Sequence, residues 1–229
     1  MQKNLFLLLT IVLLSVGISC KKKKNDTAAP APDFQPLTAG SEWNYTITTG
    51  ATSTSYKLTA TSRDTLVNGR SYRVMTNSAG PNEYLNRTGS DYYRFANLAE
   101  LNNQAVELLY LKDNLNRGQS WVETKNINIV LPPPVGTVPL TAKFTFTVAE
   151  KGIDHTVNGT LYRNVIRINA VPEFSALVLG APSAIPSTSD LRYFYAPGIG
   201  LINSVNNISI PLASINNSSE TRLTSATIR

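Results

Sequence analysis

The stretch DTLVNGRSYR at 64–73 recurs as DHTVNGTLYR at 154–163, and both copies read D-x-x-V-N-G-x-x-Y-R. An Asn-Gly pair between strand-forming residues favours a type I′ turn, because both central residues of that turn adopt a positive φ. The sequence therefore predicts two β-hairpins, one around each Asn-Gly pair. The predicted pairs are 56–67 with 70–76 and 143–157 with 160–169.

A second repeat pairs LTAGSEWNYT at 37–46 with LNRGQSWVET at 115–124, and it contains both tryptophans of the chain. Both copies read L-x-x-G-x-x-W-x-x-T. We interpret each as a turn glycine followed by a core tryptophan at the start of a strand. Two matched blocks in the same order predict two internally repeated halves, 34–114 and 115–229.

Residues between the repeats alternate between apolar and polar with a period of two, as in Trp43, Tyr45 and Ile47, which is typical of strands. The segment 99–104 could form a helical turn, whereas 106–111 is typical of a strand. No long amphipathic helix is predicted. We therefore expect an all-β fold: a single curved antiparallel sheet or half-barrel, spanning 34–229, with roughly ten to thirteen strands.

Two apolar, proline-bearing stretches in the second half have no counterpart in the first: INIVLPPPVGTVPL at 127–140 and FSALVLGAPSAIP at 174–186. Proline and glycine argue against unbroken central strands, so loops are predicted at both places. Apolar loops can contact a ligand, a partner or a membrane, or they can fold over the sheet and close its core. The candidate ligand or partner residues are Val130, Leu131, Val135, Val138, Phe174, Leu177, Val178, Leu179 and Ile185.

The amino-terminal residues follow the order of a secretory signal: Lys3, the apolar run 5–16, and small residues before Cys20. The apolar run falls short of the ~20 residues that a membrane-spanning helix needs. The segment VGISC at 16–20 resembles a bacterial lipoprotein cleavage box, although Gly17 stands where leucine is commonest. We therefore predict a lipoprotein signal peptide at 1–19 and acylation of Cys20. The alternative is a secreted protein that is cut near Ser19 and carries a chance cysteine.

Residues 20–33 are predicted to be a lipidated tether. Lys21–Lys24 would lie at the lipid headgroups or serve as a solvated spacer, and the small, proline-rich NDTAAPAP at 25–32 is typical of an extended linker. Membrane lipid, reached through acylated Cys20, is thus one predicted partner.

The net charge of +6 is confined to the amino terminus, where Lys3 and Lys21–Lys24 supply five of the 21 basic residues. Beyond Lys24 the chain has 16 basic and 15 acidic residues, so nucleic acid is not an expected partner. One cysteine and one histidine exclude internal disulfides and Cys/His metal sites within the sequence. No cofactor is predicted.

A catalytic triad would require His155, which we interpret as a lone exposed histidine beside a hairpin turn. The acids are scattered singly, so the sequence offers neither a catalytic pair nor a metal cluster. We expect a protein that is not an enzyme, although a fold could still bring two acids together.

The segments FQPLTAGSEWNY at 34–45 and YAPGIGLI at 195–202 resemble those of largely uncharacterised envelope lipoproteins of Bacteroidetes. That resemblance implies a curved antiparallel half-barrel of the lipoprotein-carrier kind, with an apolar concavity. It would make the chain a lipid-anchored, non-catalytic envelope protein that binds an apolar or glycan-like ligand or a partner protein. The alternatives are a scaffold module without a pocket and an envelope hydrolase. The basic residues after Cys20 favour the periplasmic face of the outer membrane over the cell surface.

Overall fold

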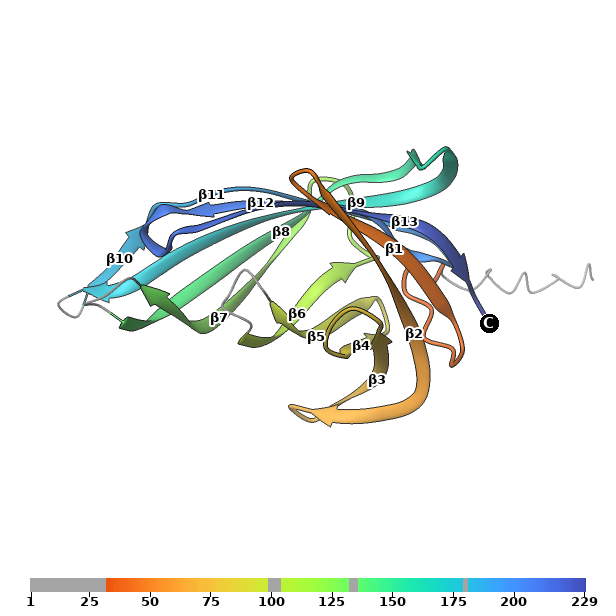
Figure 1. Cartoon of the computed structure of the whole chain (residues 1–229), viewed down its shortest axis with the longest axis horizontal. Coiled ribbons are helices and arrows are strands. Elements are labelled where there is room, and N and C mark those ends of the chain that lie inside the picture. The colour runs from red at the N-terminus through yellow and green to blue at the C-terminus, as the bar shows by residue number, and fades with distance from the viewer. Residues whose placement is uncertain (1–31, 99–103, 132–135, 179–180) are drawn as a thin grey trace, which may run out of the picture. The chain divides into compact units, whose positions relative to one another are not determined.

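The computed structural model describes residues 32–98, 104–131, 136–178 and 181–229, with the side chains of 97, 98, 129–131 and 178 left aside. These residues form one antiparallel sheet of thirteen strands (Figure 1), and their one helical element is the three-residue 3-10 turn Pro211–Ala213. Within the described ranges, no helix has the length and apolar character that crossing a membrane requires.

Along the chain the strands fall into two sets, within which each strand except the tenth pairs with the one that follows it. The first set is β1 (Glu42–Thr49), β2 (Thr52–Val67), β3 (Arg70–Asn77), β4 (Glu83–Thr88), β5 (Asp91–Leu98) and β6 (Gln104–Lys112). The second set is β7 (Ser120–Leu131), β8 (Gly136–Val157), β9 (Thr160–Val178), β10 (Ala181–Ile185), β11 (Thr188–Ala196), β12 (Gly200–Ile210) and β13 (Ile215–Thr227).

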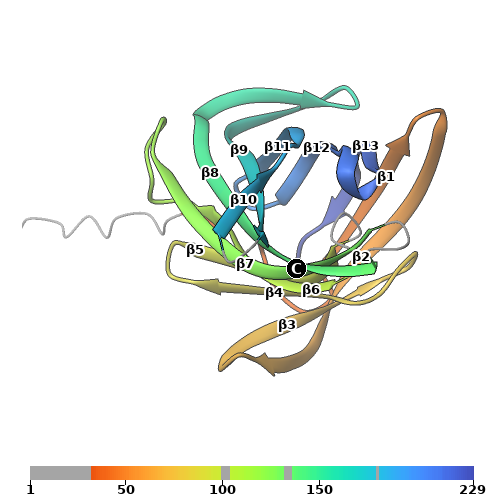
Figure 2. The same cartoon turned by 90° about the vertical axis from the view of Figure 1, so that its left-hand side faces the viewer.

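The hydrogen-bonded order is β6-β5-β4-β3-β2-β1-β13-β12-β11-β9-β8-β7, and β10 pairs with β9. The two sets therefore join through β1 and β13, while β6 and β7 lie at the two ends of the order. These ends meet at a seam, where Trp121 Nε1 donates to Leu109 O (2.8 Å) and Asn128 N donates to Gln104 Oε1 (2.8 Å). The sheet thus curls into a nearly closed barrel with one seam (Figure 2). This confirms the predicted all-β, curved antiparallel fold.

Both Asn-Gly hairpins form as predicted. In β2 and β3 the ladder ends at Val67↔Arg70, and in β8 and β9 it ends at Val157↔Thr160. The Asn-Gly residues adopt positive φ in both turns, with φ of 51° and 79° at 68–69 and of 49° and 81° at 158–159. The local turn chemistry therefore sets the register of both hairpins.

The two tryptophan blocks also have the same local geometry. Gly40 and Gly118 adopt φ values of 83° and 85°. The N–H of Gly40 donates to Ala60 O on β2, and the N–H of Gly118 donates to Val148 O on β8. Trp43 is 1% exposed and Trp121 is 9% exposed. This confirms the interpretation as turn glycines and core tryptophans, while duplication of the two halves stays a prediction.

The predicted loops at 127–140 and 174–186 are wrong, because most of both stretches belongs to hairpins. Strands β7 and β8 pair out to Leu131↔Gly136, and β9 and β10 pair out to Val178↔Ala181. Pro139 and Pro182 are tolerated because each lies where its strand has one partner: β8 pairs with β9 only from Thr141 onward, and β10 pairs only with β9.

The segment 106–111, predicted as a strand, lies within β6, which confirms that assignment. Of the helical turn predicted at 99–104, residues 99–103 lie outside the described residues, and Gln104 begins β6.

The interior holds two clusters of buried apolar side chains. One gathers around Trp121, Phe146 and Ile168, and the other around Trp43, Met75 and Ile202. The segment before β1 packs inside the sheet as well: Phe34 and Gln35 are buried, and Phe34 N donates to Tyr92 Oη (3.2 Å). The space between these groups is where the candidate site lies.

Candidate functional site

The sheet encloses a cavity of about 320 Å³ that borders both core clusters. This volume lies at the lower end of the ~300–1,000 Å³ typical of small-molecule sites. Inward-facing residues of β1, β2, β4–β6, β8, β9 and β11–β13 line it, together with Gln35. These residues are Gln35, Trp43, Tyr45, Ile47, Tyr56, Leu58, Glu83, Leu85, Arg94, Ala96, Val106, Leu108, Tyr110, Phe144, Phe146, Ala170, Phe174, Leu191, Tyr193, Tyr195, Leu201, Ser204, Asn206, Ile208, Ser219 and Thr221.

One wall of the cavity is apolar. Phe144, Phe146 and Phe174 project from β8 and β9, where alternate residues face the interior. Phe146 stacks between Phe144 (centroids 6.2 Å apart) and Trp121 (5.2 Å). Val106 and Leu108 of β6 complete this wall. Such a surface suits a hydrocarbon chain, because its burial there removes apolar area from water.

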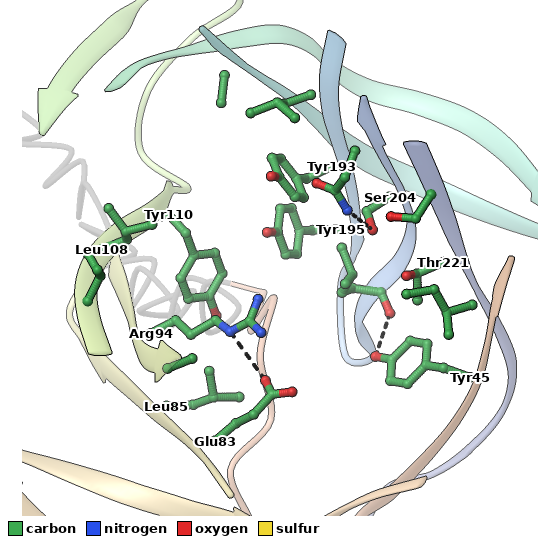
Figure 3. A pocket seen from close by; sticks show the side chains of 18 of the residues that line it. Tyr45, Glu83, Leu85, Arg94, Leu108, Tyr110, Tyr193, Tyr195, Ser204 and Thr221 are labelled. Carbon is green, nitrogen blue, oxygen red and sulfur yellow. Dashed lines mark hydrogen bonds and ion pairs between the residues drawn. The ribbon is translucent and has the colours of Figure 1, made fainter. Parts of the chain in front are cut away.

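A second part of the lining is charged. Arg94 of β5 and Glu83 of β4 both face inward, and Arg94 Nε lies 3.2 Å from Glu83 Oε2. The nearby carboxylate raises the pKa of Arg94 above its ordinary value and outweighs the opposing effect of burial. Figure 3 shows the terminal nitrogens of Arg94 directed into the pocket, and this side chain keeps 40% of its accessible surface.

Tyrosines surround the ion pair. Tyr45 Oη donates to Leu201 O (2.9 Å; Figure 3), and Tyr110 Oη donates to Gln35 Oε1 (3.5 Å). Burial raises the pKa of Tyr56 to about 12 and raises those of Tyr45, Tyr110 and Tyr195 well above the usual 10. These phenols therefore stay neutral at physiological pH and offer hydroxyl groups without adding charge.

The cavity combines an apolar wall with one cation, one anion and several neutral hydroxyls. Glu83 is the one acid among its described lining residues. Across the described chain, no group of three or more His, Cys, Asp or Glu side chains could hold a metal ion. The arrangement suits non-covalent binding of an elongated molecule with one polar end.

His155 lies elsewhere, in an open polar groove of about 830 Å³ that also contains Arg192, Asn203, Glu220 and Arg222. It was expected to be exposed, but it is half-buried and stacks on Phe194 with ring centroids 4.0 Å apart. The tip of the β8–β9 hairpin folds back against β11–β13, and Asn158 Nδ2 donates to Leu223 O (3.0 Å). The exposed-turn expectation is therefore wrong, since the hairpin is long enough to reach its neighbouring strands.

The predicted ligand residues are dispersed in the structure. Phe174 lines the cavity, Ile185 is buried in the larger core cluster and Val138 packs against that cluster. Leu177 is 74% exposed. Val130, Leu131 and Val178 lie on strands, but their side chains are not described. Val135 and Leu179 fall outside the described residues. Cys20 also falls outside the described residues.

Sequence reasoning missed Arg94 and Glu83. Their local signal is the alternation of charged and apolar residues in Glu83-x-Leu85 and Arg94-x-Ala96, which places both kinds on one face of a strand. That pattern is usually read as an exposed charge. The face of β4 and β5 that carries Glu83 and Arg94 points inward only because the sheet curls into a barrel.

No protein-family model matches the chain, and no curated protein matches it. Among solved structures, it is similar to a candidate lipoprotein from Parabacteroides distasonis, with a TM-score of 0.52 and 9% identity, over 87% of this chain and 100% of the other. A candidate exported protein with a YmcC-like fold from Bacteroides fragilis overlaps less, with a TM-score of 0.42 and 9% identity, over 86% of this chain and 100% of the other. The second overlap is too low to support an argument.

At such low identity, the first likeness concerns the fold alone. The region Pro32–Arg229 therefore has the curved antiparallel fold of the Parabacteroides distasonis protein, which is the fold that the resemblance implied.

Proposed function

We propose that this protein is a lipid-anchored, non-catalytic binding protein of the cell envelope, which holds one amphipathic molecule inside its sheet. The observation that carries the proposal is the cavity of about 320 Å³, which pairs an apolar wall with the Arg94–Glu83 ion pair. The hydrocarbon part of the ligand would lie against Phe144, Phe146 and Phe174. Its polar end would lie beside Arg94.

A partly buried ion pair supports binding better than it supports stability. Taking two charges out of water costs several kcal/mol per ion, and well-packed apolar residues in their place are often neutral or stabilising. Arg94 and Glu83 therefore need a purpose other than holding the barrel together. In an otherwise apolar pocket, the few polar side chains usually bind the polar group of a ligand.

The same cavity argues against the scaffold alternative, in which the interior would be filled by side chains. The hydrolase alternative needs two acids, or an acid and His155, in one cleft. Glu83 is alone among the described lining acids, and His155 lies in the separate outer groove beside Glu220. Hydrogen bonds from Asn203 and Arg222 outweigh burial and lower the pKa of Glu220, which does not suit a general acid.

A cavity-filling substitution tests the binding proposal. Ala170 lines the cavity, whereas the adjacent Val171 is 54% exposed on the opposite face of β9. Ala170→Phe should weaken binding of the uncharged lipid 1-monolauroylglycerol at least tenfold, and Val171→Phe should leave it unchanged. The full chain with Cys20→Ser, secreted without its acyl anchor, allows a titration without detergent.

Far-UV circular dichroism must show that Ala170→Phe still folds, and Leu108→Trp provides a second way to reduce the cavity. Equal binding by the folded cavity-filling variants and by Val171→Phe would refute an interior ligand. Saturation at one lipid per chain is the expected stoichiometry.

The anchor is tested separately. Cys20 is the only cysteine, so Cys20→Ser should abolish incorporation of a clickable palmitate analogue and release the protein from membranes. Retention of the label in that variant would contradict acylation at Cys20. Lys21–Lys24 form a trypsin site, and resistance of this site in intact cells, with cleavage after outer-membrane rupture, is expected for the periplasmic face. Cleavage in intact cells would place the protein on the surface.

A further inference from the structure

The ion pair in the cavity leaves one edge of its guanidinium open. Glu83 Oε2 lies beside Arg94 Nε at 3.2 Å, and that buried nitrogen has no well-aligned hydrogen bond. The two terminal nitrogens lie on the other side and point toward the centre of the pocket (Figure 3). A bound polar group would meet this open edge first.

The net charge of the lining residues limits which polar group a ligand can place beside Arg94. Glu83 already matches the charge of Arg94, and it is the one described acid in the lining. The tyrosines around Arg94 add no charge, because burial raises their pKa values: that of Tyr56 is about 12, and those of Tyr45, Tyr110 and Tyr195 are also raised. The site is therefore neutral before a ligand enters.

An anionic headgroup would disturb this balance. A carboxylate or phosphate on the open edge would be attracted by Arg94 but repelled by Glu83 on the far side of the same guanidinium. It would also lose its hydration, a cost that a pair of opposite neighbouring charges does not offset. A net negative charge would then remain enclosed in the barrel.

An uncharged oxygen acceptor avoids both penalties. It accepts charge-assisted hydrogen bonds from the guanidinium, and it leaves the Arg94–Glu83 pair as the only charges in the site. Tyr110 and Tyr195, which lie near Arg94, offer further hydroxyl groups to such a headgroup. We infer that the ligand, on the proposed function, is an uncharged amphiphile whose ester or hydroxyl oxygens bind the open edge of Arg94.

Two probes with the same acyl chain test this inference. Laurate is an anion at pH 8, whereas 1-monolauroylglycerol is neutral and carries ester and hydroxyl oxygens. Both are titrated below their critical micelle concentrations into the soluble Cys20→Ser chain, with binding followed by calorimetry. The neutral lipid should bind at least tenfold more tightly than laurate.

Removing the charge of Glu83 should weaken or abolish this preference. Glu83→Gln keeps a side chain of similar size but leaves Arg94 unbalanced, so the affinity for laurate should rise at least tenfold. Glu173→Gln is the matched control, because Glu173 pairs with Lys143 on the exposed face of β9 and its side chain is 61% accessible. This control should leave both affinities unchanged.

The outcomes separate the two claims. Wild-type protein that binds laurate as tightly as the neutral lipid, or a Glu83→Gln variant with an unchanged ratio, would overturn the uncharged headgroup while leaving the binding function intact. Absence of binding by both probes would overturn the proposed function and this inference with it.

Discussion

At the scale of single residues, the sequence does not reveal which side chains from other strands contact a given residue. His155 illustrates this, because Phe194 of β11 stacks on it and Glu220 of β13 acts on its charge. Glu150 and Arg167, on its own hairpin, act on its charge as well. Burial is the main reason that its pKa lies below the ordinary 6.5, and Arg167 lowers it further. The tryptophan assignments needed no such neighbours, since they rested on a local motif.

The lowered pKa of His155 predicts a pH-dependent contribution to stability. Between its folded-state pKa and about 6.5, the unfolded chain binds the proton more readily, so stability falls as the pH drops through this window. His155→Phe keeps an aromatic ring against Phe194 and cannot titrate. The variant should therefore lose less of its melting temperature than the wild type between pH 7.5 and pH 5. Equal losses in both proteins would show that His155 contributes nothing to acid sensitivity.

At the scale of elements, the sequence predicts the features that depend on residues close together in the chain, such as tight turns. The Asn-Gly turns specify both central hairpins, because few sequences favour two successive positive φ values. The extensions of β7–β8 and β9–β10 could not be predicted from composition. Whether Pro139 or Pro182 breaks a strand depends on how many partners that strand has at that position, and pairing between distant segments decides this.

The turn glycines offer a test of this local control. Gly69 adopts a φ of 79°, where an alanine costs about 1–2 kcal/mol, whereas Gly80 lies outside the left-handed region and its Cβ would meet only ordinary contacts. Gly69→Ala should therefore lower the free energy of unfolding by about 1–2 kcal/mol. Gly80→Ala should change it by less than about 0.5 kcal/mol. Urea denaturation measures both, and similar values for the two would argue against a strained turn.

At the scale of the whole molecule, the sheet is continuous through the β1–β13 pair, and the larger core cluster contains residues from both predicted halves, such as Tyr92 and Trp121. This continuity explains why the residues that line the cavity could not be assembled from the sequence, although an apolar concavity was expected. Arg94 and Glu83 belong to the first half and Phe144 and Phe174 to the second, so their meeting depends on closure of the sheet rather than on any one segment.

A shared sheet and core predict that the two halves unfold together. Trp43 lies in the first half and Trp121 in the second, so Trp121→Phe and Trp43→Phe give two single-tryptophan proteins. In each variant, the fluorescence transition in urea should coincide with the far-UV circular dichroism transition. A fluorescence midpoint that departs from the circular dichroism midpoint in either variant would show that the halves unfold separately.

The central claim, that the sheet holds an amphipathic molecule, is tested most directly by a crystal structure with a terminally brominated analogue of 1-monolauroylglycerol. The account predicts an anomalous bromine peak beside Phe144, Phe146 and Phe174, with the glycerol oxygens at the open edge of Arg94. A bromine peak outside the sheet, or a lipid whose headgroup lies against the phenylalanine wall, would contradict it.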